Sequence, residues 1–118
     1  MAVFSGKNSI TQTDFIVTDS DVDETAIDDL FGGAAVVYSL FIENASSLAH
    51  LKIYDAADPT VGTTAPDIIL QAVASEQIDW QIVDGISFTN FSYACVQEDG
   101  TSGTTAPAGT VKLHSVVR

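Results

Sequence analysis

Short runs in which hydrophobic and polar side chains alternate, separated by turn-forming residues, recur along most of this chain. An alternation with a period of two places one set of side chains on each face of a β-strand. Seven or eight such runs, spaced eight to twelve residues apart, predict an all-β fold: an antiparallel β-sandwich or a jelly-roll-like arrangement rather than a parallel α/β sheet. The expected strands are residues 14–18, 34–43, 49–54, 67–73, 78–83, 86–88, 91–96 and 111–118.

The same alternation predicts which side chains face the interior of the sandwich. In residues 34–43, one face is expected to carry Val36, Tyr38, Leu40 and Ile42. In residues 49–54, the side chains expected to point outward are His50, Lys52 and Tyr54. Trp80 is expected to point inward, because Ile78 and Ile82 flank it at the same phase. The dipeptide Asp84-Gly85 is a strong turn signal and predicts a turn between two strands.

A chain of 118 residues is long enough for one domain that buries its own core. We expect residues 19–118 to form a single β-sandwich domain, and residues 1–18 to be either an N-terminal arm or its first strand. Residues 26–33 follow an acidic run and end in Gly32-Gly33, which predicts at most one short helical turn. A plain loop is the alternative for this segment.

The charge balance limits the partners that this chain can bind. With 16 acidic and 4 basic residues the formal net charge is −12, which argues against nucleic acid and anionic membranes, since both require clustered Lys or Arg. The first ten residues show no signal-peptide core, and no apolar run approaches the ~20 residues of a membrane span. We therefore expect synthesis and folding in the cytoplasm.

The acidic run is the strongest candidate for a metal site. Asp19, Asp21 and Asp23 have the spacing that opens a calcium-binding loop. The sixth position of such a loop needs Gly and is Glu24, and the twelfth needs Glu and is Leu30. The preferred interpretation is a solvated acidic loop that also caps the short helical turn, so no metal ligand is assigned.

No constellation of residues predicts catalysis. His50 and His114 are expected at outward strand positions without a neighbouring carboxylate, and Cys95 lies in an apolar run where a free thiol acts as a small hydrophobe. Gly-x-Ser-x-Gly, P-loop and dinucleotide-binding motifs do not occur in the sequence. We therefore expect a protein that is not an enzyme and that has no catalytic, metal or cofactor-binding residues.

Aromatic residues and one repeated loop sequence are the remaining candidates for recognition. The aromatic group comprises Trp80, Phe88, Phe91 and Tyr93. Core filling is the favoured role for these side chains, and an exposed sugar-stacking platform is the alternative. The sequence Gly-Thr-Thr-Ala-Pro occurs at residues 62–66 and again at 103–107, each time before an expected strand. On the same end of a sandwich, these two loops would form a compact, threonine-rich surface.

The order of several short motifs resembles that of small β-proteins encoded among the virion structural genes of tailed bacteriophages. The motifs are YSLFIEN at 38–44, LKIYD at 51–55, PTVGTTAP at 59–66, GISF at 85–88 and the aromatic strand at 91–96. The resemblance covers about residues 34–118. In that group a hydrophobic strand ends in an Asn, which Asn44 matches here.

The resemblance implies a capsid decoration, or cement, protein on the outer surface of the virion, with the major capsid protein as partner. A homo-oligomer is expected, and a trimer on local threefold positions is the favoured form. The alternative from another class is a head-fibre or tail accessory protein that recognises a host-surface glycan. An unassembled binding module of host origin is a third possibility.

Overall fold

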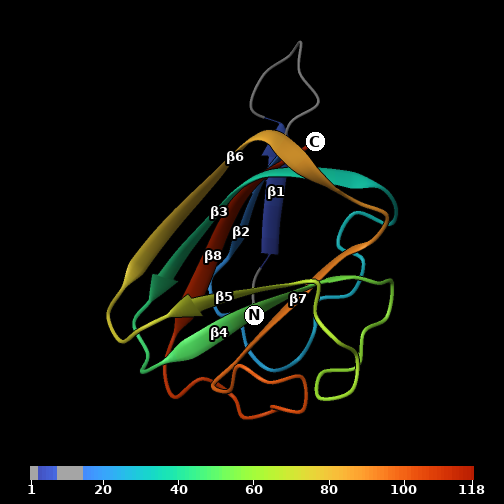
Figure 1. Ribbon diagram of the computed structural model, residues 1–118. Coiled ribbons are helices and arrows are strands. Elements are labelled where there is room, and N and C mark those ends of the chain that lie inside the picture. The colour runs from blue at the N-terminus through green and yellow to red at the C-terminus, as the bar shows by residue number, and fades with distance from the viewer. Residues whose placement is uncertain (1–2, 8–14) are drawn as a thin grey trace.

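The computed structural model describes residues 3–7 and 15–118, and within them it shows eight β-strands and no helix (Figure 1). The strands are β1 (Val3–Lys7), β2 (Phe15–Asp19), β3 (Ala35–Asn44), β4 (Ala49–Asp55), β5 (Ile68–Ala72), β6 (Gln77–Phe88), β7 (Phe91–Val96) and β8 (Val111–Val117). The expected all-β class is confirmed. The boundaries of β7 agree with those expected for residues 91–96.

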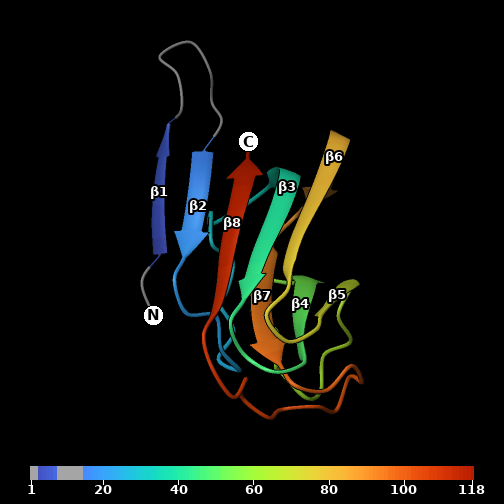
Figure 2. The same cartoon turned by 90° about the vertical axis from the view of Figure 1, so that its left-hand side faces the viewer.

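The strands form two sheets that pack as a sandwich. The larger sheet has the order β1-β2-β8-β3-β6, and the smaller has the order β5-β4-β7. Neighbouring strands are antiparallel in both sheets. Figure 2 shows the five strands of the larger sheet side by side, with the three strands of the smaller sheet against their lower part. The antiparallel sandwich is the architecture that the spacing of the expected strands favours.

The core lies between the two sheets and is rich in aromatic rings. All six residues of β7 are buried. Phe91 stands at the centre of the aromatic group, with ring centroids 5.2 Å from Phe88, 5.7 Å from Tyr93 and 6.4 Å from Phe31. Edge and offset contacts at such separations add to the stabilisation that comes from buried area alone. Phe88, Phe91 and Tyr93 therefore fill the core, which is the role that the sequence favoured for these aromatic residues.

A bulge corrects the expected face pattern of β3. Val37 is buried on one side of the bulge and Leu40 on the other, so the inward phase changes within the strand. The register shows why: Val37 pairs with Ile86 but Ser39 pairs with Gln81, which leaves residues 82–85 of β6 opposite the single residue 38. Strict alternation fails here because extra residues in one strand shift the phase of the pairing.

The expected turn at Asp84-Gly85 is wrong, because both residues lie inside β6. Gly85 adopts φ +73°, a left-handed conformation that glycine tolerates. A Cβ at this position would lie 2.9 Å from Cε1 of Tyr38 and would also collide with Val36. The signal that indicated a turn thus marks the point where β3 and β6 bend together (Figure 1).

The segment 20–33 closes one side of the sandwich and is not helical. Ile27 and Tyr93 exchange backbone hydrogen bonds of 2.9 and 3.2 Å, and Leu30 N–H donates to Phe91 O at 2.9 Å. Cys95 N–H donates to Asp23 O at 2.8 Å. The edge of β7 therefore uses backbone groups that a helical turn would need for its own hydrogen bonds. The expected helical turn at 26–33 is wrong, and the loop alternative holds.

The outward face of β4 is covered by a loop. His50, Lys52 and Tyr54 have the predicted phase, but all three are buried, with exposures of 4, 0 and 1%. His50 Nδ1 donates to Gln97 O at 2.8 Å and Lys52 Nζ donates to Gly100 O at 2.5 Å, which ties the 97–109 loop over this face. Alternation assigns a side chain to a face of a strand, and it does not show that a distant loop will fold over that face.

The two Gly-Thr-Thr-Ala-Pro loops pack against each other. A Cβ on Gly62 would lie 2.5 Å from Cγ2 of Thr104, and Gly62 itself has φ +93°. Thr105 N–H and Oγ1–H both donate to the carboxylate of Glu98 within the second loop. The repeat therefore supplies two contacting loops at the same end of the sandwich, which is the arrangement expected for a threonine-rich surface.

Candidate functional site

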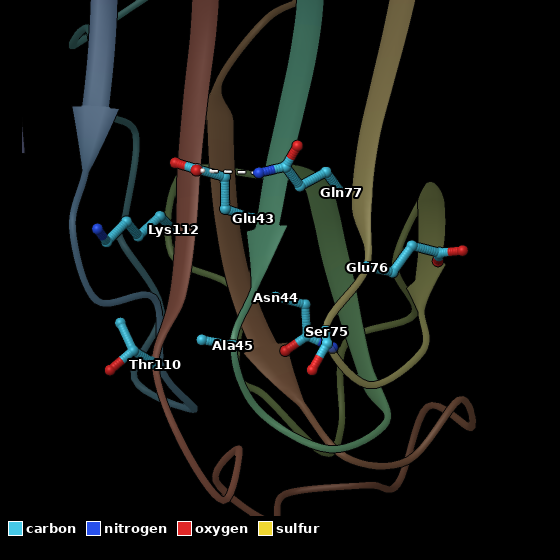
Figure 3. Close-up of a pocket in the computed structure, with 8 residues that line it drawn as sticks. All are labelled: Glu43, Asn44, Ala45, Ser75, Glu76, Gln77, Thr110 and Lys112. Carbon is cyan, nitrogen blue, oxygen red and sulfur yellow. Dashed lines mark hydrogen bonds between the residues drawn. The ribbon is translucent and has the colours of Figure 1, made fainter.

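An open pocket of about 550 Å³ lies on the outer face of the five-stranded sheet, at the end where β3 leaves it. Its floor is formed by Glu43, Asn44 and Ala45 at the end of β3. One rim is Thr110 and Lys112 at the start of β8, and the other is residues 75–77 before and at the start of β6 (Figure 3). Three strands that are distant in sequence therefore form one concave surface.

Asn44 holds the floor of this pocket in place. Its Nδ2 lies 2.8, 3.1 and 3.0 Å from the carbonyl oxygens of Ser47, Ala72 and Val73, and its Oδ1 accepts from Ser46 N–H at 2.9 Å. The side chain is buried, so these bonds replace the water that it would otherwise bind. Asn44 is also the strand-ending Asn of the phage resemblance, which is the sequence signal that pointed to it.

The backbone joins the floor to both rims. Asn44 N–H donates to Glu76 O at 2.9 Å, and Ala45 N–H donates to Thr110 O at 3.0 Å. Ser75 has φ +59°, a left-handed conformation that is uncommon for a residue with a side chain and that makes the β5–β6 turn tight. The pocket is therefore built on a rigid frame of ladder and turn hydrogen bonds.

Glu43 is the centre of a polar network beside the pocket. Its Oε2 is 2.9 Å from His114 Nε2, and its Oε1 accepts from Gln77 Nε2 at 3.4 Å. His114 Nδ1 is 3.4 Å from Thr18 Oγ1, and the imidazole lies 5.7 Å from the Phe41 ring. Glu43 and His114 are about one-third exposed, so this ion pair contributes at most about 1 kcal/mol to stability. The expectation that His114 has no neighbouring carboxylate is wrong, because Glu43 contacts it. The two residues are 71 positions apart in sequence, so their contact is not visible from the sequence.

The network has the order hydroxyl, imidazole, carboxylate, and its hydroxyl lies within a paired part of the sheet. Thr18 lies in the ladder between β1 and β8, opposite Phe4 and His114, so the neighbouring N–H groups belong to sheet pairing. Acyl transfer requires free N–H groups aimed at a developing oxyanion. The pocket instead offers carboxylates, an ammonium group, hydroxyls and an amide, which suit hydrogen bonding to a polar ligand or protein surface.

The acidic run forms a loop in which Ser20, Asp21, Glu24 and Thr25 are exposed, as the sequence predicts, but Asp19 is an exception and no helical turn follows for the loop to cap. Asp19 is fully buried at the end of β2, where Tyr93 Oη donates to its Oδ2 at 2.9 Å and Asp21 N–H donates to its Oδ1 at 3.1 Å. Asp23 Oδ1 accepts from Thr25 N–H at 2.9 Å. These carboxylates do not converge, and the described part of the chain contains no group of three or more His, Cys, Asp or Glu that could hold a metal ion.

The other predicted candidates are dispersed. His50 lies under a loop on β4 and His114 on the outer face of the opposite sheet, so the two do not share a surface. Cys95 is fully buried, and burial raises the pKa of its thiol to about 12, which keeps it protonated and unreactive. Trp80 is partly buried and packs against the core with the inward phase that was expected.

The described residues include no helix that is long and apolar enough to cross a membrane. Comparisons with known proteins give this chain no relative: it matches no protein-family model, no curated protein and no solved structure.

Proposed function

We propose that this chain is a non-enzymatic capsid decoration protein that binds the outer surface of an assembled phage head through the outer face of its five-stranded sheet. The basis is the motif order that resembles small virion proteins. Most of those motifs fall on β3, β4, β6 and β7, so they contribute strands to both sheets. A symmetric oligomer and a virion location belong to the same proposal, with the trimer still a prediction.

The observation that carries the proposal is the character of the outer face. Three adjacent strands, β2, β8 and β3, leave Ile16 45% exposed and Phe41, Tyr38 and Val116 half-buried, so apolar and aromatic groups reach solvent on a broad sheet surface. Polar groups of the pocket border them. Mixed apolar and polar surfaces with aromatic contacts are typical of protein interfaces.

Binding to the assembled shell is the whole of the proposed function. A ligand that binds the assembled state and not its dissociated parts stabilises assembly by mass action, by about 2.7 kcal/mol per site at a free concentration one hundred times its dissociation constant. Occupied sites on neighbouring capsomers would then raise the temperature or the denaturant concentration at which heads open.

Copy number and a pair of matched variants test the proposal. Quantitative mass spectrometry of purified virions should find hundreds of copies, whereas a few copies would indicate a tail or vertex component. Ile16→Asp and Ile69→Asp each place a carboxylate at a similarly exposed isoleucine, 45% and 41% exposed, on opposite sheets. In co-sedimentation with heads that lack the protein, Ile16→Asp should bind at least tenfold more weakly and Ile69→Asp like the wild type. Equal binding by both variants would contradict the assignment of the outer face.

A second candidate, recognition of a host-surface glycan, is favoured by the pocket and not by the aromatic platform considered first. Its lining combines hydroxyls, carboxylates, an amide and an ammonium group, which can bind sugar hydroxyls. Gln77 lines this pocket, and Gln71 is another exposed glutamine, on β5 and outside the pocket. If glycan binding occurs, an array of neutral and acidic oligosaccharides should give hits that Gln77→Ala loses and Gln71→Ala keeps.

A further inference from the structure

The free edge of β6 offers a row of unpaired backbone groups. β6 has 12 residues and ends the order of the larger sheet, so within the described residues its outer side has no strand partner. Asn44 N–H donates to Glu76 O in the β3–β6 ladder. Hydrogen-bonded pairs alternate along such a ladder. The intervening residues Gln77, Asp79 and Gln81 therefore direct their N–H and C=O groups toward the open side.

An apolar seam runs along the same side of the molecule. β5 and β6 are the adjoining edge strands of the two sheets, and a short turn joins them (Figure 1). The partly buried apolar residues of these strands that pack on the core are Ile68, Leu70, Ile78, Trp80, Ile82 and Ile86. Val83, at the end of the straight part of β6, is 92% exposed. Segment 20–33 seals the opposite side by bonding to β7, and no described segment bonds to β6 in that way.

We propose that a second copy of this chain docks on this edge by antiparallel β6–β6 pairing about a twofold axis at Trp80. This register places Trp80 opposite its own counterpart and Ile78 opposite Ile82. It also places Asp79 opposite Gln81, whose Nε2 already donates to the Asp79 carboxylate at 2.5 Å within one chain. Between residues 77 and 83, every inward apolar residue then meets an apolar residue and no two acidic residues are opposed. Glu76 and Asp84 meet only at the two ends of this stretch.

The neighbouring registers are less complementary. An axis at Asp79 would set the two Asp79 carboxylates against each other, and like charges directly opposite are destabilising. An axis at Gln81 would set Ile78 opposite Asp84. The edge of β6 is thus complementary to a second copy of itself in the register with the axis at Trp80. An isologous twofold interface requires such self-complementarity.

The dimer keeps the outer faces of both copies on the same side, because the twofold axis is perpendicular to the joined sheet. Two outer faces in one plane can bind one extended surface with higher avidity than a single face. The contact itself does not depend on the decoration proposal.

Charge substitutions at Gln81 test the contact and its register. The axis at Trp80 places residue 81 of each copy opposite Asp79 of the other, so Gln81→Lys creates two opposite-charge pairs and Gln81→Asp two like-charge pairs. Gln71→Lys and Gln71→Asp are matched controls, because Gln71 is an exposed strand glutamine on β5. They change the net charge of −12 by the same amounts without touching β6.

Sedimentation velocity of the full chain at about 1 µM to 1 mM should show a monomer–dimer equilibrium. Relative to its Gln71 control, Gln81→Lys should tighten the dimer by about 2- to 30-fold and Gln81→Asp should weaken it by a similar factor. A protein that is monomeric at every concentration overturns the proposal, and a strand of a different protein would then be the alternative partner for this edge. Gln81 variants that behave like their Gln71 controls, or a dimer that Gln81→Lys weakens, overturn it as well.

Discussion

At the scale of single residues, the most unusual contact is the buried pair of Asp19 and Tyr93. The carboxylate accepts from the Tyr93 phenol and from the backbone N–H of Asp21. Burial is the main cause that raises the pKa of Asp19 above its usual value, and it also raises the pKa of Tyr93 well above its usual value. The charged form of Asp19 is thus disfavoured in the folded state.

Asp19→Asn should remove a pH dependence of stability. Because the folded pKa of Asp19 is raised, ionisation opposes folding: the penalty is absent below the unfolded value of 3.8 and grows as pH rises through the folded pKa. The Asn variant should therefore be at least as stable as the wild type at pH 7, and this difference should shrink toward pH 4. Urea unfolding at both pH values measures it.

Tyr93→Phe is the control for the Asp19 prediction, because it leaves the buried carboxylate without its phenol donor. It should destabilise the protein by about 1–3 kcal/mol at pH 7. An Asp19→Asn variant that is less stable than the wild type by a similar amount would contradict the stated direction of the pKa shift.

At the scale of elements, the bend shared by β3 and β6 depends on Gly85. Its φ of +73° disfavours any residue with a Cβ, and that Cβ would meet the Tyr38 ring and Val36. Gly100 has no neighbour within 4 Å of an added Cβ and does not have a positive φ. Gly85 therefore has both the positive φ and the close neighbours that exclude a side chain, and Gly100 has neither.

Gly85→Ala should lower the free energy of unfolding by about 1–3 kcal/mol, since it combines a strained backbone with a steric contact. Gly100→Ala should change it by less than about 0.5 kcal/mol, as most exposed substitutions do. Thermal and urea unfolding of both variants measure the difference. Equal effects of the two substitutions would show that the bulge does not require glycine.

At the scale of the whole molecule, the fold should not depend on a metal ion. Asp19 is bonded to the Tyr93 phenol, and Asp23 is bonded to Thr25 N–H, so these carboxylates are directed to protein donors. We expect the same melting temperature with and without EDTA. A decrease of more than a few degrees in EDTA would restore a cation-binding role for the acidic run.

The role of the N-terminal segment is also a question about the whole molecule. β1 pairs with β2 as an ordinary edge strand, while residues 1–2 and 8–14 lie outside the described part of the chain. Because β1 pairs only with β2 within the described residues, deletion of residues 1–12 should leave a folded sandwich with the same far-UV circular dichroism. A truncated chain that does not fold would make β1 an integral strand, and one that folds but no longer decorates heads would support the arm hypothesis.

The sequence by itself determined the class of fold and most strand positions. Side-chain alternation and turn residues are local, so they locate a strand such as 91–96 and identify Leu51 or Ile53 as inward-facing without knowledge of the partner strand. The same local signals favoured core positions for Phe91 and Tyr93. They carry no information on which strands pair.

Only the tertiary structure decided the features that depend on distant segments. Lys52 is buried because a loop nearly fifty residues away folds over it, and Glu43 meets His114 only because β3 pairs with β8. Asp84-Gly85 has turn chemistry, but pairing with β3 extends the strand through it and uses the glycine for a bulge. The pocket likewise forms from three strands that register brings together. Long-range pairing sets these outcomes, because local propensities of about 1 kcal/mol or less are outweighed by burial and ladder hydrogen bonds.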